Sequence, residues 1–406
     1  MVTGNCGISL APLVSAQLPP APLDLLGREG WRHERFADYL GALESAGPAT
    51  NAACLVGHTT LRVRHMAQLD RPATAGEARA MAQDLEEALR SGALGLSTGF
   101  YYPPARAATV DEVLIAGAPL RAAGGLLAMH IRDEGAAIDE ALREALSLGQ
   151  ALGVDTVLSH HKLVGRDNHG RSVQTLGMIE AAARHQGVCL DCYPYTASST
   201  MLLAARVSQS DEVLITWSQA DPTAAGQSLF TLARQRGCTP EALAEALSPA
   251  GAIYFAMSEE DVSRILAHPL TLIGSDGLPH DASPHPRLWG SFPRVLGHYA
   301  RDRRLFSLET AVHKMTGLSA RRFGLQGRGL LVPGHAADLV VFDALTVGDR
   351  ATFAEPARVS HGIRAVFVNG RLACLGGRTQ DRHAGQVLRR GPVADRHLRA
   401  EAARAS

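Results

Sequence analysis

Near-continuous apolar runs alternate with amphipathic stretches along most of this chain. The runs are rich in valine, leucine and isoleucine, a pattern typical of strands that are buried on both faces. Strands of this kind separated by helices indicate a parallel sheet covered by helices. The predicted strands are residues 2–10, 52–57, 93–99, 126–132, 155–162, 188–194 and 272–276, and the main predicted helices are residues 74–90, 110–123, 136–152 and 172–186. Thr74 and Glu77 have the spacing of a capping box, which predicts the start of the first of these helices.

The pattern predicts an α/β fold, a TIM-type (β/α)8 barrel from which the first strand is missing. Seven predicted strands are one fewer than the eight that close such a barrel. An eighth candidate, residues 253–257, lies in a long excursion between about 200 and 270. Long insertions of this kind tend to be functional, so we interpret the excursion as a loop-and-helix lid over the rim. The barrel with its lid insertion is expected to span residues 1–325.

The chain changes in character after about Leu318. Residues 329–334, 337–343 and 363–371 are interpreted as short strands joined by tight turns. We therefore expect a small β module over residues 326–375. Residues 376–406 are rich in arginine, glycine and alanine and are expected to form a mobile tail.

The composition argues against several classes of partner. The 40 basic and 40 acidic residues cancel and form no long run of one sign, so nucleic acids and acidic lipids are not expected partners. The chain has no apolar stretch of about 18 residues and no secretory signal before Val2, so we expect no membrane span and a cytoplasmic location. Six scattered cysteines suit a reducing compartment. We expect a small-molecule substrate, and the sequence leaves the oligomeric state open.

Side chains able to bind a metal stand in or at the ends of four predicted strands: Cys6, His130, the pair His160 and His161, and Asp276. In a parallel barrel, catalytic groups from many strands converge at this rim. A single histidine on an apolar strand is usually a packing residue, but two on consecutive strands favour metal binding. One sulfur and two imidazoles suit Zn²⁺ better than a hard cation such as Mg²⁺.

Strand geometry and position assign roles within this set. Adjacent strand residues point to opposite faces, so only one of His160 and His161 faces the barrel axis. We interpret His160 as the ligand and His161 as a packing residue. Asp276 precedes Gly277 and fits either an Asx turn or a group that moves a proton at the metal. Its place beside strands that supply ligands favours proton transfer.

Two further motifs are interpreted as structural. Residues 95–99 match the G-x-S-x-G nucleophile elbow, which requires a helix directly after its serine. Phe100 to Pro104 follow instead, and this proline-containing segment is not expected to start a helix cleanly. Cys189 and Cys192 have C-x-x-C spacing, but a strand places them on opposite faces and no second pair exists. Core packing is the simpler interpretation of both cysteines.

Lys162, Tyr193 and Arg287 form a further group expected near the rim. A structural salt bridge would be the simplest interpretation of any one of them. Together, two cations and a phenol suit recognition of a substrate carboxylate, because arginine binds carboxylates bidentately.

These motifs resemble those of the amidohydrolase superfamily, and more narrowly those of the D-aminoacylase (N-acyl-D-amino-acid deacylase) family. The matching pieces follow the family's order over essentially the whole chain. They are GNCG (4–7), LVGH (55–58), GLSTG (95–99), His130 with Arg132 and Glu134, SHHK (159–162), DCYPY (191–195), SDG (275–277) and GHAADL (334–339).

The resemblance implies a fold, a cofactor and roles for named residues. It implies an α/β barrel beside a β-sandwich, of which residues 326–375 would be a part. It also implies a Zn²⁺ ion held by Cys6, His130 and His160, with Asp276 moving a proton from the attacking water to the leaving nitrogen. The residues implied to bind the substrate carboxylate are Lys162, Tyr193, Ser199 and Arg287, and those implied to form a pocket for an apolar side chain are Tyr101, Tyr254 and Met257.

The activity implied by the resemblance is zinc-dependent hydrolysis of N-acyl-D-amino acids, preferably with apolar side chains, to a carboxylate and a free D-amino acid. The family begins with a β-sandwich segment and a barrel strand that carries a His-x-His pair. This sequence contains neither, so we expect a truncated gene product or a late start.

Three alternatives remain. Cyclic-amide hydrolases of the hydantoinase or dihydroorotase type commonly use a carboxylated lysine, and neither Lys162 nor Lys314 lies on the fourth or an earlier strand. Deacylases for acidic side chains would need an added cation in the side-chain pocket, and Tyr254 and Met257 argue against one. The third alternative is a truncated, catalytically impaired remnant.

Overall fold

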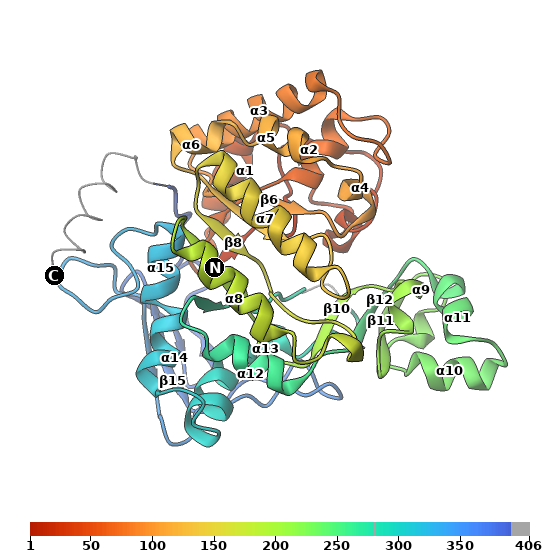
Figure 1. The fold of residues 1–406 in the computed structure, drawn as a ribbon. Helices are drawn as coiled ribbons and strands as arrows, with labels where there is room; N and C mark the ends of the chain where they lie inside the picture. Colours follow the sequence, from red (N-terminus) through yellow and green to blue (C-terminus); the bar gives the residue numbers. More distant parts are fainter. Residues whose placement is uncertain (279–280, 391–406) are drawn as a thin grey trace.

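Parallel strands form the centre of the fold (Figure 1). The computed structural model describes residues 1–278 and 281–390. Six strands form one parallel sheet in the order β13-β9-β8-β7-β6-β5, and β1 pairs in parallel with β4, just before β5. The strands are β1 Val2–Thr3, β4 Ala53–Cys54, β5 Val56–Gly57, β6 Gly95–Gly99, β7 Leu126–His130, β8 Thr156–Leu158, β9 Val188–Cys192 and β13 Thr271–Ile273. All seven predicted runs therefore contribute parallel strands.

Both faces of this sheet are buried, which explains the near-continuous apolar runs. In β7, Leu127 and Met129 belong to the large core between sheet and helices, whereas Leu126 and Ala128 belong to a second core on the opposite face. Alternating side chains of one strand thus enter two different cores.

Helices follow the strands along the chain and pack around them (Figure 1). The predicted capping box is confirmed, because the Thr74 side chain accepts from the Glu77 backbone and the Glu77 side chain accepts from the Thr74 backbone. The predicted helix over residues 110–123 is divided, since Pro119 starts a new helix. The helices up to β9 are α1 Phe36–Ala46, α2 His58–His65, α3 Ala75–Arg90, α4 Pro103–Arg106, α5 Val110–Ala116, α6 Pro119–Ala123, α7 Ile138–Leu152 and α8 Ser172–Ala183.

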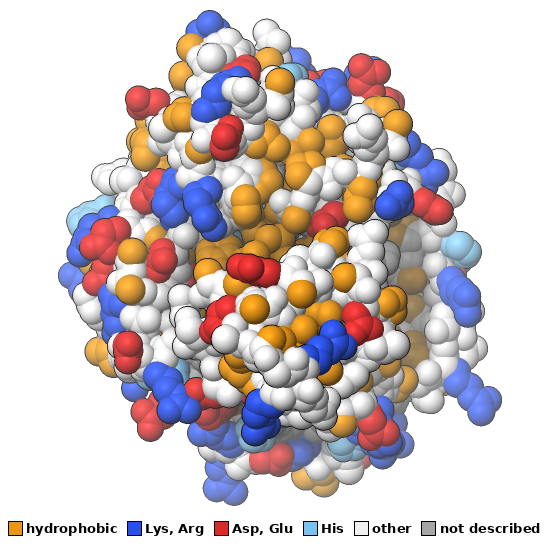
Figure 2. Space-filling view, turned by 90° about the vertical axis from the view of Figure 1, so that its right-hand side faces the viewer, with side chains coloured by type: hydrophobic (Ala, Val, Ile, Leu, Met, Phe, Trp, Pro, Cys, Tyr) orange, Lys and Arg blue, Asp and Glu red, His pale blue; other side chains and the backbone are white. Residues whose placement is uncertain are grey.

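The excursion between β9 and β13 forms a lobe of its own (green in Figure 1). It contains an antiparallel sheet in the order β10-β12-β11, so the interpretation as loops and helices alone is wrong. Residues 253–257 fall largely in β12 of this sheet and supply no barrel strand. When the molecule is viewed from the side of this lobe, which is the right-hand side of Figure 1, hydrophobic side chains gather in a hollow near the middle of the face (Figure 2). The elements are β10 Ala197–Met201, α9 Ala204–Val207, β11 Glu212–Ser218, α10 Leu229–Arg236, α11 Pro240–Leu247, β12 Ala250–Phe255 and then α12 Glu259–Ala267.

The C-terminal part contains helices and an antiparallel sheet in the order β14-β15-β16-β17. The strand expected over residues 329–334 is absent from the described chain, because Gly329 and Gly334 adopt positive φ angles and turn the backbone. The elements are α13 Arg287–Arg294, a π-helical segment Val295–Asp302, α14 Leu308–Met315, α15 Gly317–Phe323, β14 Leu339–Phe342, β15 Ile363–Val368, β16 Arg371–Leu375 and β17 Arg378–Thr379.

A part of the expected tail packs against the rest of the protein. Val387 is buried and forms a bridge with Ala52, so the chain returns to the edge of β4. Residues 391–406 of the expected tail lie outside the described residues. Among the described residues, no helix is both long and apolar enough to cross a membrane.

The capping box generates a prediction about stability. We expect Thr74→Ala to lower the free energy of unfolding by about 1 kcal/mol, because it leaves an N-terminal backbone donor of α3 without its acceptor. Thr74→Ser keeps the hydroxyl and should cost clearly less. Urea denaturation of both variants measures the difference, and equal losses would contradict the capping role.

Candidate metal centre and substrate site

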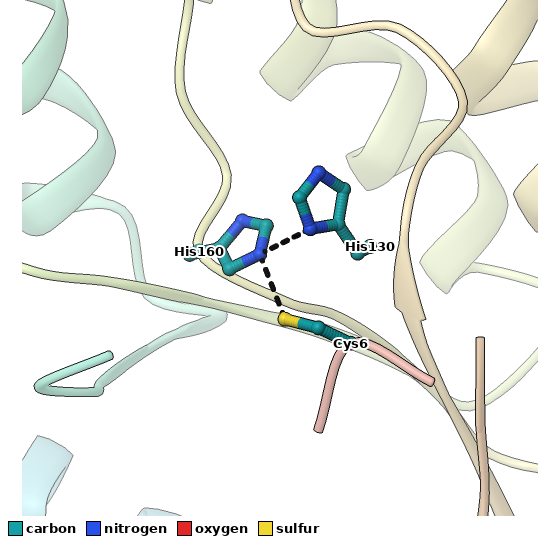
Figure 3. A group of neighbouring side chains, drawn as sticks. All are labelled: Cys6, His130 and His160. Atoms are coloured by element: carbon teal, nitrogen blue, oxygen red, sulfur yellow. Dashed lines mark hydrogen bonds between the residues drawn. The ribbon is translucent and has the colours of Figure 1, made fainter. Parts of the chain in front are cut away.

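Three side chains with metal-binding atoms meet where β1, β7 and β8 end. Cys6 follows β1, His130 is the last residue of β7, and His160 follows β8. His160 Nε2 lies 3.2 Å from Cys6 Sγ and 2.9 Å from His130 Nδ1, and the three side chains point toward one another (Figure 3). The three ligand atoms all lie within 4.8 Å of one another. The structure thus brings together the three residues that the sequence predicted as ligands.

This donor set fits a tetrahedral zinc ion. Bonds of about 2.3 Å to sulfur and about 2.0 Å to nitrogen place sulfur and nitrogen about 3.5 Å apart, and two nitrogens about 3.3 Å apart. The observed separations are only slightly shorter. Burial holds the pKa of His130 well below its usual range, so this imidazole is neutral, as a ligand must be. Cys6 is only partly buried, whereas both imidazoles are buried.

The charges around His160 also favour a cation there. Burial and the nearby Lys162 oppose a positive charge on the ring, but the Cys6 sulfur and the Asp276 carboxylate raise the pKa of His160 to about 10. Surroundings that retain a proton on this ring also attract a metal cation to it.

Left-handed backbone conformations mark the strand ends that carry these residues. Cys6, His160 and Asp276 have φ angles of 57°, 40° and 46°, a region that non-glycine residues rarely adopt. Among the described residues, only Arg304 and Asn369 share this feature. Such a conformation costs of the order of 1–3 kcal/mol and persists only where the surroundings enforce it.

The surroundings of Cys6 enforce its conformation through β6. The Ser97 hydroxyl accepts a hydrogen bond from Gly7 N at 3.0 Å and donates one to Gly4 O. A side chain at Gly99 would place its Cβ 2.1 Å from Cys6 O, so only glycine permits this approach. Ser97 is fully buried inside β6, so it holds the Cys6 turn and does not form a nucleophile elbow. A short helix, α4, does begin at Pro103, contrary to expectation, because proline is tolerated at a first helical position.

Asp191 enforces the conformation of His160. Its carboxylate accepts from His160 N at 2.9 Å, and its backbone carbonyl accepts from His161 N at 2.8 Å. His161 turns away from the centre and contacts Thr175 Oγ1 at 3.0 Å, as expected for a packing residue. Sequence reasoning missed Asp191, because its contact with His160 joins two strands.

Glu134 joins the imidazoles to two cations, and sequence reasoning gave it no role. Its Oε1 lies 3.2 Å from His160 Nδ1 and 3.6 Å from His130 Nε2, the ring nitrogens that do not face the metal position. It also pairs with Lys162 Nζ, and its Oε2 lies 3.7 Å from Arg206. Burial favours neutral Glu134, but Lys162 and the two histidines hold its pKa well below the usual range. One buried carboxylate thus lies beside the outer nitrogens of both imidazoles and is closer to that of His160, the position from which such groups orient metal-binding rings.

The four residues predicted to bind a carboxylate lie close together. The Tyr193 ring has Arg287 Cζ at 4.6 Å and Lys162 Nζ at 5.8 Å from its centre. Arg287 Nη2 donates to Ser199 O at 3.2 Å, and Arg287 Nη1 lies 2.8 Å from Asp276 Oδ2. Within the described chain, Ser199 Oγ and Arg287 Nε are buried without a hydrogen-bond partner. Unpaired buried donors beside two cations suit an anionic ligand.

The predicted apolar pocket contains a cation that sequence reasoning missed. Arg206 Cζ lies 5.1 Å from the centres of both the Tyr101 and Tyr254 rings, so Tyr254 does not exclude a cation, contrary to the argument from the sequence. Tyr101 stacks on His130 at 5.4 Å. The Tyr254 hydroxyl forms hydrogen bonds with backbone groups of the insertion. The Met257 sulfur accepts a weak hydrogen bond from the Tyr193 hydroxyl at 3.9 Å.

A pocket of about 820 Å³ opens beside Arg206. Its walls come from the segments after β6, β7 and β8 and from the start of the insertion, and they include Tyr101, Glu134, Arg166 and Arg206. Arg166 is 76% exposed and paired with Asp211, whereas Arg206 is buried.

The two cysteines of the C-x-x-C motif pack in different places. Cys189 belongs to the core that contains Leu126, and Cys192 to the core that contains Met129. Both thiols are free, and burial raises the pKa of each to about 12. This pair is a part of the core, as predicted.

Comparison with known proteins gives a consistent result. Residues 28–373 match the Amidohydrolase family. The chain is 56% identical to a D-aminoacylase from Alcaligenes xylosoxydans xylosoxydans over 391 residues, which are 96% of this chain and 81% of the relative. It is 53% and 48% identical to an N-acyl-D-aspartate deacylase and an N-acyl-D-glutamate deacylase of that organism, over 96% of this chain and 79% and 80% of those relatives.

Solved structures agree. A D-aminoacylase studied for its binuclear metal centre superposes with a TM-score of 0.94 at 54% identity, over 96% of this chain and 82% of the other. The N-acyl-D-glutamate deacylase of Bordetella bronchiseptica, solved with zinc and a phosphonate mimic of the tetrahedral intermediate, superposes with a TM-score of 0.92 at 45% identity and the same coverage. The chain therefore belongs to the amidohydrolase family, within the group of D-aminoacylases and N-acyl-D-amino-acid deacylases.

Proposed function

We propose that this protein is a zinc-dependent hydrolase that converts N-acyl-D-amino acids into a carboxylate and a free D-amino acid. The observation that carries this proposal is the arrangement of Cys6, His130 and His160 beside a cationic subsite built on Tyr193. A zinc centre next to a carboxylate-binding subsite suits a linear amide whose leaving amine carries a carboxylate. The relatives named for this activity, at 48–56% identity, support the assignment.

The proposed mechanism assigns one task to each group. Bound zinc would supply Lewis-acid polarisation of the acyl carbonyl and activation of water. Lys162, Tyr193, Ser199 and Arg287 hold the α-carboxylate and so orient the scissile amide. A carboxylate oxygen of Asp276 accepts a proton from the attacking water and then donates it to the departing nitrogen.

We further propose that the parallel strands belong to a (β/α)8-type barrel spanning residues 1–325, with the insertion at about 200–270 as its lid. The parallel order of the strands supports this architecture. We assign residues 326–375 to a β-sandwich. The exposed side chains of Val340 and Val341 in β14 support this assignment, since a second β layer would cover apolar side chains on the sheet.

The site supports two candidate classes of substrate side chain. Apolar side chains fit Tyr101 and Met257, as the resemblance implies. Acidic side chains are favoured by Arg206, which faces the pocket as a buried cation next to a single shared carboxylate, Glu134.

The activity is tested with the two enantiomers of one substrate. We expect the zinc-loaded protein to hydrolyse N-acetyl-D-methionine and not N-acetyl-L-methionine. Chelation of the metal should abolish turnover, and added Zn²⁺ should restore it. Soluble, monodisperse protein that neither binds zinc nor hydrolyses the D-enantiomer would instead support a catalytically impaired remnant, and hydrolysis of a hydantoin alone would support the cyclic-amide hydrolase.

The role of Asp276 is tested by Asp276→Asn. We expect kcat to fall by roughly 10²–10⁴-fold, the range of a general acid–base contribution, while zinc content stays unchanged. Asp302→Asn is the control, because Asp302 also pairs with an arginine but is exposed and lies in the π-helical segment after α13. Retained activity in Asp276→Asn would refute the assigned role.

The side-chain class is tested by Arg206→Met, which removes the charge and keeps the length. We expect the protein to accept N-acetyl-D-glutamate, and the variant to lower kcat/KM for this substrate, relative to N-acetyl-D-methionine, by roughly 10–100-fold. The size follows from about 1.5–3 kcal/mol for a hydrogen bond to a charged group. Arg166→Met, in the same pocket, should change this ratio much less. An equal loss on both substrates would assign Arg206 to packing alone.

A further inference from the structure

The proposed catalytic base and a proposed substrate-binding residue contact each other. Arg287 opens α13 and is 1% exposed, and its Nη1 lies 2.8 Å from Oδ2 of Asp276, which follows β13. The same guanidinium therefore has two tasks, since it holds the base and is also assigned to the substrate carboxylate.

The Arg287–Asp276 contact is an ion pair in which another acceptor could replace Asp276. Although Nη1 lies close to Asp276, it forms no aligned hydrogen bond within the described residues, and neither does Nε. The guanidinium is fixed by Nη2, which donates to Ser199 O at 3.2 Å. Two of its three nitrogens thus remain available to a better-aligned acceptor. A carboxylate that meets the planar fork with both oxygens is such an acceptor.

The second cation of the subsite differs in its partner. Lys162 flanks the same Tyr193 ring but pairs with Glu134, which contacts the imidazoles. Of these two cations, Lys162 thus contacts Glu134, and Arg287 contacts the proposed base, Asp276.

We propose that the α-carboxylate of the substrate displaces Asp276 from Arg287, so that the base becomes free only when a carboxylate occupies the subsite. This inference rests on the proposed deacylase function. One carboxylate replaces another at the guanidinium, and the net charge of each group stays the same. The released Asp276 oxygen can then accept the proton of the attacking water.

Through this exchange, the protein distinguishes substrates by the rate of the chemical step as well as by affinity. An oxygen held by a guanidinium is a poor proton acceptor, so a substrate without the α-carboxylate leaves the base occupied. Such a substrate loses kcat as well as affinity, because remote binding interactions are used to assemble the reacting groups. Arg287 acts here as a positioning residue through Asp276.

The test compares N-acetyl-D-methionine with its neutral, isosteric α-carboxamide on the zinc-loaded full chain. The unaltered protein should hydrolyse the acid and turn over the amide slowly. Arg287→Met should lower kcat/KM for the acid, yet raise kcat for the amide about tenfold, which is a part of the 10²–10⁴-fold contribution of a general base. A purely structural role of Arg287 predicts losses on both substrates, so an unchanged or lower kcat for the amide would overturn the proposal.

Two further variants keep the result interpretable. Lys162→Met also removes a cation of the subsite, but it takes a partner from Glu134 and leaves Asp276 paired with Arg287, so it should give no gain on the amide. Arg287→Gln retains a donor for Ser199 O and serves if Arg287→Met folds poorly, as judged by melting temperature and zinc content. If the unaltered protein does not hydrolyse N-acetyl-D-methionine, the proposed function fails. If it does and neither Arg287 variant gains on the amide, only the exchange fails.

Discussion

The site depends on an unfavourable backbone conformation at three strand ends. A parallel strand ends in an extended conformation. A single residue in the left-handed region then changes the direction of the backbone. Cys6, His160 and Asp276 all adopt this conformation, and non-glycine residues resist it. Neighbouring groups must therefore enforce it, as Ser97 does for the turn at Cys6 and Asp191 does for His160. Buried polar groups such as Ser97 and Asp191 are thus as necessary to the geometry of the site as the proposed metal ligands.

Charge balance is the second constraint on this site. Glu134 is shared by Lys162, Arg206 and both imidazoles, and Asp276 is paired with Arg287. Buried charges are tolerated only when they are paired, so the protein provides acids for these cations. In the proposed exchange, an anionic substrate changes partners within this network and need not bring a charge into an empty cavity.

Local signatures made much of the fold and the metal centre predictable. Apolar runs marked the parallel strands, and the Thr74–Glu77 spacing marked a helix start. The run 2–10 was predicted too long, because Gly4 and Gly7 turn the chain after Thr3. The insertion was misjudged, since strands such as β10 contain Ser198, Ser199 and Thr200 and lack an apolar pattern. Arg206 sits in an ordinary Ala-Ala-Arg-Val segment, which carries no sign of a binding role.

The sequence by itself determined the chemistry available to this protein. Residue identity at strand ends is enough to indicate a thiolate and imidazole centre, because donor atoms and strand direction are local properties. Only the tertiary structure decided which charges meet. Arg206 lies between Tyr101 and Tyr254, and Arg287 lies against Asp276, because separate segments pack together there. Electrostatic energy depends on distance and burial, and a sequence pattern contains neither quantity.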